Sequence, residues 1–178
     1  MARNPFRRSV HVPTAVVEAA PLEKGEKVLA GTAARDGSWL LGTRDALVLT
    51  GSVETRVPWQ QIERADWDRD AERLDVVEVG EFGLVRPAYS FSIDDPGLLL
   101  ELIRERVTAS VVLQRHVRVD GSRGLFVIAR RAPRGDGEIT WAFEFDRGVD
   151  PDDPGVMAAA RRALDAASEE LGLGPGPN

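Results

Sequence analysis

The residues of this chain best suited to chemistry are arginines that gather in one stretch of sequence. Residues 110–134 contain six of them against a single acid, Asp120. These arginines are Arg115, Arg118, Arg123, Arg130, Arg131 and Arg134. A guanidinium group is planar and binds carboxylate or phosphate through paired hydrogen bonds. If Arg118 and Arg130 are neighbours on adjacent strands, they form a positive surface suited to such an anion.

Two interpretations of this arginine group stay open. The candidates for a binding surface are Arg115, Arg118, Arg130 and Arg131. They either receive an external anion or pair within the molecule, with an acidic stretch nearby or with the acids of the last helix. We favour internal pairing or plain solvation, because charged side chains are mostly exposed to solvent.

The acidic stretch precedes the arginine group in the chain. Residues 60–81 hold eight acids against three arginines. Paired carboxylates can act as general acid and base when a common cleft separates their pKa values. These acids flank a predicted turn, where charge typically marks a solvated edge that discourages association between strands. The sequence therefore favours a solvated acidic hairpin over a catalytic carboxylate site.

The four tryptophans are the other candidates for a contact surface, because each covers about 200 Å². Trp39 and Trp141 have apolar neighbours, which predicts core positions. Trp59 follows Pro58 at a strand end, and Trp67 stands between two aspartates. Either of these two could be partly exposed and belong to a binding surface, although burial is the outcome we favour for both.

Residue counts and motifs exclude several kinds of catalytic and metal chemistry. The chain has no cysteine, which rules out thiolate nucleophiles, sulfur-ligated zinc and disulfides. Two histidines, His11 and His116, cannot build a three-imidazole site. No phosphate-binding glycine motif and no nucleophile-elbow sequence occurs. We therefore predict no catalytic residue, no cofactor-binding residue and no metal ligand, and assign the acids at residues 150–153 to helix capping and not to calcium.

Composition indicates a folded protein of the cytoplasm. Hydrophobic residues make up 43% and charged residues 29% of the 178 residues, enough to bury a core. No apolar run approaches the roughly 20 residues of a membrane span, and no secretory signal is expected at the start. The formal net charge of -6 opposes attraction to nucleic acid and to anionic membranes, so a nucleic-acid partner is not expected.

The elements that must position these residues begin with seven short strands. Alternating apolar residues and closely spaced turn signals predict strands at residues 27–34, 38–41, 46–50, 53–57, 62–68, 73–79 and 88–93. An Asp-Asp-Pro-Gly sequence then begins a helix, with Asp95 as its N-cap and Pro96 as its first residue. The prediction is an α+β fold in which a seven-stranded barrel is capped by this helix.

Three further strands and a second helix are expected after the barrel. The strands lie at residues 111–119, 125–131 and 138–145, and the helix at residues 154–171 after a second Asp-Asp-Pro-Gly sequence. The expected division is an N-terminal arm at 1–23, the barrel with its helix at 24–109, a β-rich extension with the C-terminal helix at 110–171, and a disordered tail at 172–178. Whether the extension is a separate domain stays open, as does the oligomeric state.

Two apolar strands around a Thr-Arg turn occupy residues 39–49, with Thr43 and Arg44 in the turn. A Val-Pro-Trp-Gln-Gln-Ile segment follows at residues 57–62. In these features residues 24–109 resemble bacterial pleckstrin-homology-like domain proteins, which often carry such a turn and an Ile-Pro-hydroxyl-x-x-Ile segment. The chain departs from them at the turn, where they tend to have asparagine. The resemblance implies a helix-capped barrel whose recurring role is binding of lipids, peptides or proteins, and a fold alone does not dictate function.

The function expected from these features is a non-catalytic cytoplasmic binding or scaffold module that recognises a protein partner. The acidic hairpin or the basic strands would present its contact surface. A first alternative is a peripheral membrane adaptor that recognises anionic lipid headgroups through the basic N-terminal arm and the arginine strands. A second alternative is an enzyme with a carboxylate site that the sequence does not reveal. None of the three needs a cofactor.

Overall fold

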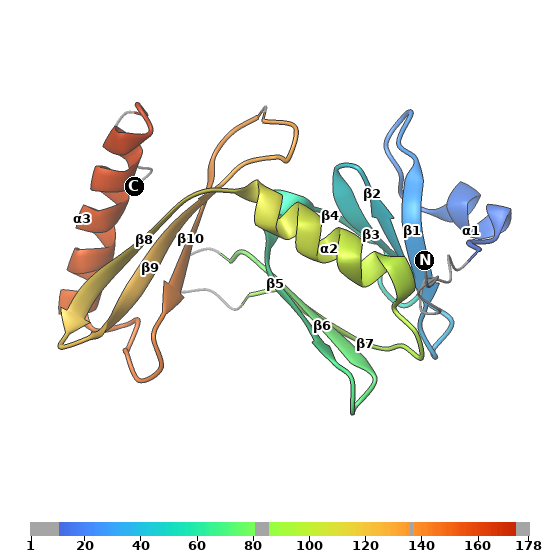
Figure 1. Cartoon of the computed structure of the whole chain (residues 1–178), viewed down its shortest axis with the longest axis horizontal. Coiled ribbons are helices and arrows are strands. Elements are labelled where there is room, and N and C mark those ends of the chain that lie inside the picture. The colour runs from blue at the N-terminus through green and yellow to red at the C-terminus, as the bar shows by residue number, and fades with distance from the viewer. Residues whose placement is uncertain (1–10, 81–85, 136, 174–178) are drawn as a thin grey trace, which may run out of the picture.

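The computed structural model describes residues 11–80, 86–135 and 137–173 of the chain. The strands are β1 (Val28–Ala33), β2 (Trp39–Thr43), β3 (Ala46–Thr50), β4 (Thr55–Pro58), β5 (Ile62–Asp68), β6 (Arg73–Glu78), β7 (Ala88–Ser92), β8 (Val111–Asp120), β9 (Arg123–Arg130) and β10 (Thr140–Phe145). The helices are α1 (Thr14–Ala19), the short 3-10 helix η1 (Trp59–Gln61), α2 (Gly97–Ser110) and α3 (Pro154–Glu170). Strands β1 to β7 with α1 and α2 form one end of an elongated molecule, and β8 to β10 with α3 form the other (Figure 1). We call these ends the N-terminal lobe (residues 11–110) and the C-terminal lobe (residues 111–173).

The seven strands of the N-terminal lobe form two sheets and not the closed barrel that the sequence pattern predicted. Their order is β1-β2-β3-β4 in one sheet and β5-β6-β7 in the other, and all pairs are antiparallel. Among the described residues no ladder joins β4 to β5 or β7 to β1. Pro58 ends β4 without an N–H to donate, and η1 then turns the chain away before β5 begins. Beyond the end of β1, a backbone hydrogen bond of 2.9 Å from Arg35 N to the carbonyl of Ser92, the last residue of β7, links the two sheets.

Helix α1 covers the outer face of the four-stranded sheet. The residues of and around α1 that pack there are Val12, Val16, Ala20 and Leu22, and they meet Leu41, Ala46 and Val48. Strand β3 is therefore buried on both faces, which accounts for its unbroken apolar sequence. The sequence pattern did not indicate this six-residue helix, since residues 1–23 were expected to be an arm. Residues 1–10 of that arm lie outside the described residues.

Helix α2 packs on the inner side of the N-terminal lobe, with Leu99 and Ile103 in the main hydrophobic core. It begins at Gly97, one residue later than predicted, and Asp95 Oδ1 accepts the Gly97 N–H at 2.8 Å. The helix approaches β2 closely at Gly42. It then runs without a loop into β8, because Ser110 ends the helix and the next residue begins the strand.

The C-terminal lobe is a three-stranded antiparallel sheet, in the order β10-β9-β8, with α3 on one face. Asp153 caps α3 as predicted, since its Oδ1 accepts the N–H groups of Gly155 at 2.8 Å and Val156 at 3.0 Å. The prediction of this helix is confirmed. Of the tail expected at 172–178, residues 174–178 lie outside the described residues. In the part of the chain that the structure describes, no helix is long and apolar enough to cross a membrane.

Candidate functional site

The structure separates the arginines that the sequence analysis grouped as one surface. In the β8–β9 ladder, Arg118 lies opposite Gly124 and Arg130 lies opposite Val111, at the two ends of the pairing. The condition that Arg118 and Arg130 are cross-strand neighbours is therefore not met. The physical reason is the register, which a sequence pattern of alternating residues leaves unspecified. Arg118 is exposed and forms no ion pair with any described residue.

Arg130 is buried at the junction of the two lobes. It is 5% exposed, and its Nη1 donates to Val107 O at 3.2 Å and to Ser110 Oγ at 3.0 Å. Its Nη2 donates to Glu63 O at 3.0 Å, so one guanidinium contacts both α2 and β5. Burial lowers the pKa of Arg130 against the opposing attraction of nearby carboxylates. Arg130 therefore ties the lobes together and is not part of a binding surface.

Arg115 is paired within the molecule, and Arg131 is partly buried with its Nε left without a hydrogen-bond partner among the described residues. Arg115 forms an ion pair with Glu170 of α3, which is the internal pairing that the sequence analysis favoured. Arg131 follows β9 and is half-buried beside the C-terminal end of α2, where its backbone N–H donates to Ser110 O at 2.8 Å. Of the four candidate arginines, only Arg118 is exposed without an ion pair among the described residues.

The two candidate tryptophans have different environments. Trp59 is fully buried in the N-terminal core, which is the outcome that the sequence favoured, so it does not belong to a binding surface. Trp67 is half-buried and lines a shallow hollow of about 510 Å³ at the acidic hairpin. The other residues of this hollow are Arg64, Asp66, Asp68, Arg69, Asp70, Arg73 and Asp75. Acids and arginines alternate there and neutralise one another in part, with an Arg64–Asp66 distance of 2.6 Å, so the hollow has no marked preference for one sign of ligand.

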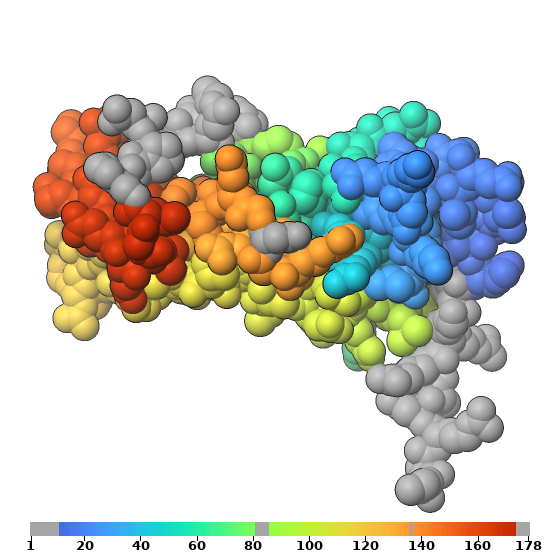
Figure 2. Space-filling model, turned by 90° about the horizontal axis from the view of Figure 1, so that it is seen from above, coloured from blue at the N-terminus to red at the C-terminus, as the bar shows by residue number. Residues whose placement is uncertain are grey.

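A second pocket, which the sequence pattern did not single out, lies at the start of β1 and has a volume of about 460 Å³. We call it the β1 pocket. Its lining residues are Glu23, Lys24, Gly25, Glu26, Lys27, Leu29, Arg44, Asp45 and Arg134. The first five lead into β1, Leu29 lies in that strand, and the next two form the β2–β3 turn. The last belongs to the β9–β10 connection, which lies against the N-terminal lobe (Figure 2). Both lobes therefore contribute to this pocket.

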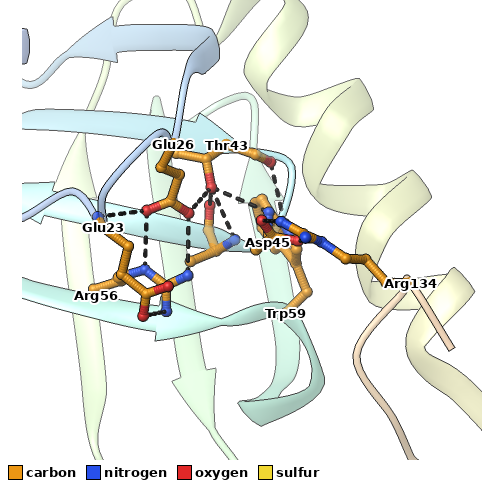
Figure 3. A network of polar contacts seen from close by, with 8 residues as sticks. Glu23, Glu26, Thr43, Asp45, Arg56, Trp59 and Arg134 are labelled. Atoms are coloured by element: carbon orange, nitrogen blue, oxygen red, sulfur yellow. Dashed lines mark hydrogen bonds and ion pairs between the residues drawn. The ribbon is translucent and has the colours of Figure 1, made fainter. Parts of the chain in front are cut away.

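Glu26 forms the fixed inner part of the β1 pocket (Figure 3). Its side chain is 3% exposed and accepts hydrogen bonds from Nε and Nη2 of Arg56, both at 3.1 Å. Arg56 also lies 3.3 Å from Glu23. Burial alone would raise the pKa of Glu26, but hydrogen bonds from Arg56, Thr43 and the Glu23 N–H outweigh it, so the pKa lies below its ordinary value. Glu26 is therefore a paired anion at neutral pH.

Thr43 holds the centre of this network. Its hydroxyl donates to Glu26 Oε1 at 2.5 Å and accepts the N–H groups of Asp45 at 3.1 Å and Ala46 at 3.0 Å. A hydroxyl has one proton and two lone pairs, so these bonds use its whole capacity. The carbonyl of Thr43 accepts the indole N–H of Trp59 at 3.3 Å, which satisfies the polar atom of that buried ring. The β2–β3 turn is therefore fixed by hydrogen bonds of both the hydroxyl and the carbonyl of Thr43.

Asp45 and Arg134 join the lobes at the rim of the pocket (Figure 3). Arg134 donates to Asp45 Oδ1 through Nε at 2.5 Å and to Oδ2 through Nη2, which is a two-point pair. The hydrogen bonds from Arg134 lower the pKa of Asp45, and the charges of Arg134 and Arg44 add to this effect, while burial opposes it. The carboxylate of Asp45 is therefore already occupied by a cation of the same chain.

Three cations around the pocket remain uncommitted. Lys24, Lys27 and Arg44 are exposed and form neither a hydrogen bond nor an ion pair with any described residue. The acids beside them are paired internally, since Arg56 pairs with the two glutamates and Arg134 pairs with the aspartate, which leaves one negative charge unbalanced. Counting Arg56, five cations face three acids, so the β1 pocket keeps a positive excess in a protein of net charge -6.

This arrangement suits binding of an anion and does not suit acid–base catalysis. A carboxyl that donates a proton near neutral pH needs a raised pKa, whereas those of Glu26 and Asp45 are lowered. Burial does raise the pKa of Glu63, but that side chain is held by Arg86 at the lobe junction, outside the pocket. Among the described residues no group of three metal-ligating side chains occurs.

One feature of the sequence does point to the β1 pocket. Lys24 and Lys27 are the only lysines among the 23 basic residues of the chain, and both line this pocket. The pairing of Asp45 with Arg134, by contrast, spans 89 positions and has no local signature. The sequence analysis did not predict the pocket, because the cations without a partner can be recognised only after the internal ion pairs are known.

Comparison of the chain with protein-family models, with curated proteins and with solved structures found no match. The functional proposal therefore depends on the geometry and charge of the β1 pocket.

Proposed function

We propose that the chain is a non-catalytic binding module that recognises a protein partner, and that the β1 pocket is its contact site. The observation that carries this proposal is the presence of three uncommitted cations, Lys24, Lys27 and Arg44, around a pocket whose acids are all paired internally. The volume of about 460 Å³ lies in the range of about 300–1,000 Å³ typical of ligand sites. We also propose that residues 24–109 are related to bacterial pleckstrin-homology-like proteins. We propose a cytoplasmic location as well, which accords with the lack of cysteine.

The charge distribution favours a protein over a membrane as the partner. A membrane presents a broad anionic surface, and a chain of net charge -6 is repelled from it as a whole. The arginines that were expected to face lipid headgroups are largely committed, with Arg130 buried and Arg115 paired to α3. A protein segment needs only the local positive charge of the pocket, so it avoids the repulsion from the rest of the molecule.

A site-specific cross-linking experiment tests this proposal. A photoreactive amino acid replaces Leu29, which lines the β1 pocket and is 53% exposed, and the full chain is irradiated in an extract of its source cells. The matched control places the same group at Val112 of β8, which is 42% exposed and lies in the other lobe. We expect a discrete protein adduct at position 29 that is absent at position 112 and is lost with K24Q/K27Q.

Two outcomes would contradict the proposal. The first is an identical set of adducts at both positions, which indicates random collisions. The second is an adduct at position 29 that K24Q/K27Q leaves unchanged, because the uncommitted cations then play no part. Co-sedimentation with phosphatidylserine vesicles in low salt runs in parallel, and lysine-dependent binding there without a protein adduct would favour the lipid alternative.

A further inference from the structure

We infer that the β1 pocket takes an acidic segment of polypeptide in extended conformation, whose carboxylates are held by Lys24, Lys27 and Arg44 and whose neighbouring apolar side chain contacts Leu29. This inference rests on the proposed function and adds the chemistry of the ligand. Its three supports are the free charge of the pocket, the backbone at Leu29 and the choice of lysine over arginine.

The first support is that the internal pairs leave a net positive site. With Glu26 neutralised by Arg56 and Asp45 by Arg134, an incoming carboxylate meets no unpaired acid of the inner pocket. Glu23 is mostly exposed but lies 3.3 Å from Arg56, which reduces its repulsion. The remaining charges lie on two separate segments, the lead into β1 and the β2–β3 turn. Cations on two segments suit several carboxylates along a chain better than one compact anion.

The second support is the backbone at Leu29. Val28 pairs with Thr43 and Ala30 pairs with Gly42, so Leu29 is the extra residue of a β-bulge and has no partner in the β2 register. Strand β1 is also the edge of the four-stranded sheet. An extended peptide beside an edge strand can add main-chain hydrogen bonds while alternate side chains enter pockets. The exposed Leu29 side chain supplies an apolar contact next to the cations.

The third support is that arginines form the internal ion pairs of the pocket, whereas both lysines are exposed around it. The internal pairs of the pocket use arginine, namely Arg56 and Arg134, whose planar fork fixes one geometry. The only two lysines of the chain face the open side. A lysine carries a compact charge on a flexible stem, which adapts to carboxylates whose positions vary along a peptide.

Fluorescence anisotropy with defined peptides tests this inference. The probe is a short fluorescein-labelled peptide of alternating glutamate and valine, so that its carboxylates share one face when extended. Its control has glutamine in place of every glutamate. With the full-length protein we expect the glutamate peptide to bind at least about ten-fold more tightly than the glutamine peptide, and we expect K24Q/K27Q to weaken the glutamate peptide by about ten-fold because two ion pairs are lost.

A charge-matched variant separates a local effect from a general one. Arg161 and Arg162 are exposed on α3, so R161Q/R162Q removes the same charge far from the pocket. We expect this variant to bind the peptide as the wild type does. An equal loss in both double variants would overturn the inference, since only net charge then matters. Equal binding of the two peptides would overturn it as well, and so would displacement of the peptide by inorganic phosphate at equal concentration, which indicates a compact-anion site.

The two proposals fail in distinguishable ways. A lysine-dependent adduct at position 29 together with no binding of the glutamate peptide contradicts the acidic ligand and leaves the protein-binding function in place. Absence of both contradicts both proposals. Thermal unfolding of each double variant checks folding, and unchanged midpoints are expected because all four substituted side chains are exposed.

Discussion

Two glutamates of this protein show how the surroundings of a single residue decide its charge. Glu26 and Glu63 are both nearly inaccessible, with side chains 3% and 8% exposed, and each pairs with one arginine. Glu26 accepts additional hydrogen bonds from Thr43 and from a backbone N–H, and its pKa is lowered. The carboxylate of Glu63 has only Arg86 as a hydrogen-bond donor among the described residues, and burial raises its pKa. The additional donors to Glu26, and at Glu63 desolvation together with the nearby charge of Glu144, separate the two cases.

E26Q is expected to destabilise the protein by about 2 kcal/mol at neutral pH, because the partly buried Arg56 loses its main counter-charge. The lowered pKa of Glu26 means that its charged form contributes stability above the ordinary value of 4.5, and that this contribution disappears as the pH falls through the folded-state pKa. Urea unfolding at a series of pH values measures the difference between E26Q and wild type. We expect the difference to be complete at pH 7 and to shrink below about pH 4.5.

E63Q is the matched control for this prediction. The raised pKa of Glu63 shows that the fold disfavours its charge, so neutralisation should change the stability at pH 7 by less than about 1 kcal/mol or increase it. If E26Q and E63Q lost the same stability, the account of the two sites by donor number would be wrong.

At the scale of secondary-structure elements, the contact between α2 and β2 determines how closely the helix covers the sheet. A Cβ atom at Gly42 would lie 2.6 Å from Leu102 Cδ2 and 2.9 Å from Leu99 Cδ1, both closer than carbon atoms pack. The glycine thus lets two leucines of α2 rest on the strand backbone. Because α2 continues directly into β8, the same contact also fixes where the C-terminal sheet begins.

G42A is expected to cost about 1–3 kcal/mol of unfolding free energy, since the added methyl group forces the leucines or the helix to move. L102A removes the nearest obstacle. The double variant should therefore be more stable than the sum of the single effects by at least about 0.5 kcal/mol, as measured by chemical denaturation. Strict additivity would show that the helix does not rest on Gly42 in solution.

The elements were predictable to different degrees for physical reasons. Alternating apolar residues and turn signals were enough to predict the strands, and the Asp-Pro-Gly sequence was enough to predict the start of α3. These signals act between residues that are close in sequence. Closure of the barrel was predicted wrongly, since it depends on how Pro58 and η1 redirect the chain between β4 and β5. Helix α1 has only six residues and is stabilised by packing on β3, so its own sequence has too little periodicity to reveal it.

The main hydrophobic cores of the two lobes are held together largely by arginines, and a third, smaller cluster lies under α1. One core lies between the N-terminal sheets and α2, and the other lies between the C-terminal sheet and α3. Across the junction, Arg130 contacts α2 and β5, Arg86 donates to Phe143 O at 2.9 Å, and Arg134 pairs with Asp45. Each contact joins residues far apart in sequence, which is why the candidate site could not be assembled from the sequence alone.

R130M is expected to destabilise the protein by about 1–3 kcal/mol, because carbonyl groups of Val107 and Glu63 lose their buried donor. It should also loosen the coupling between the lobes. Hydrogen exchange measures this, and we expect amides of β9 and β10 to exchange faster relative to those of β3 than they do in the wild type.

R115M provides the matched control for R130M. The Arg115–Glu170 pair lies on the surface of the C-terminal lobe, with about half of each side chain exposed, so its loss should change stability by less than about 1 kcal/mol. Uniform acceleration of exchange in both lobes of R130M would show that Arg130 stabilises the protein without linking its parts.

The scarcity of lysine has a practical consequence for chemical labelling. Amine-directed acylating reagents normally mark many positions, but the only side-chain amines of this chain are those of Lys24 and Lys27. Such a reagent, or an acetylating enzyme, would reach no side chain outside the β1 pocket, and each acylation removes one positive charge there. A label of low selectivity thereby becomes a selective one, and protection from acylation becomes a direct measure of whether the pocket is filled.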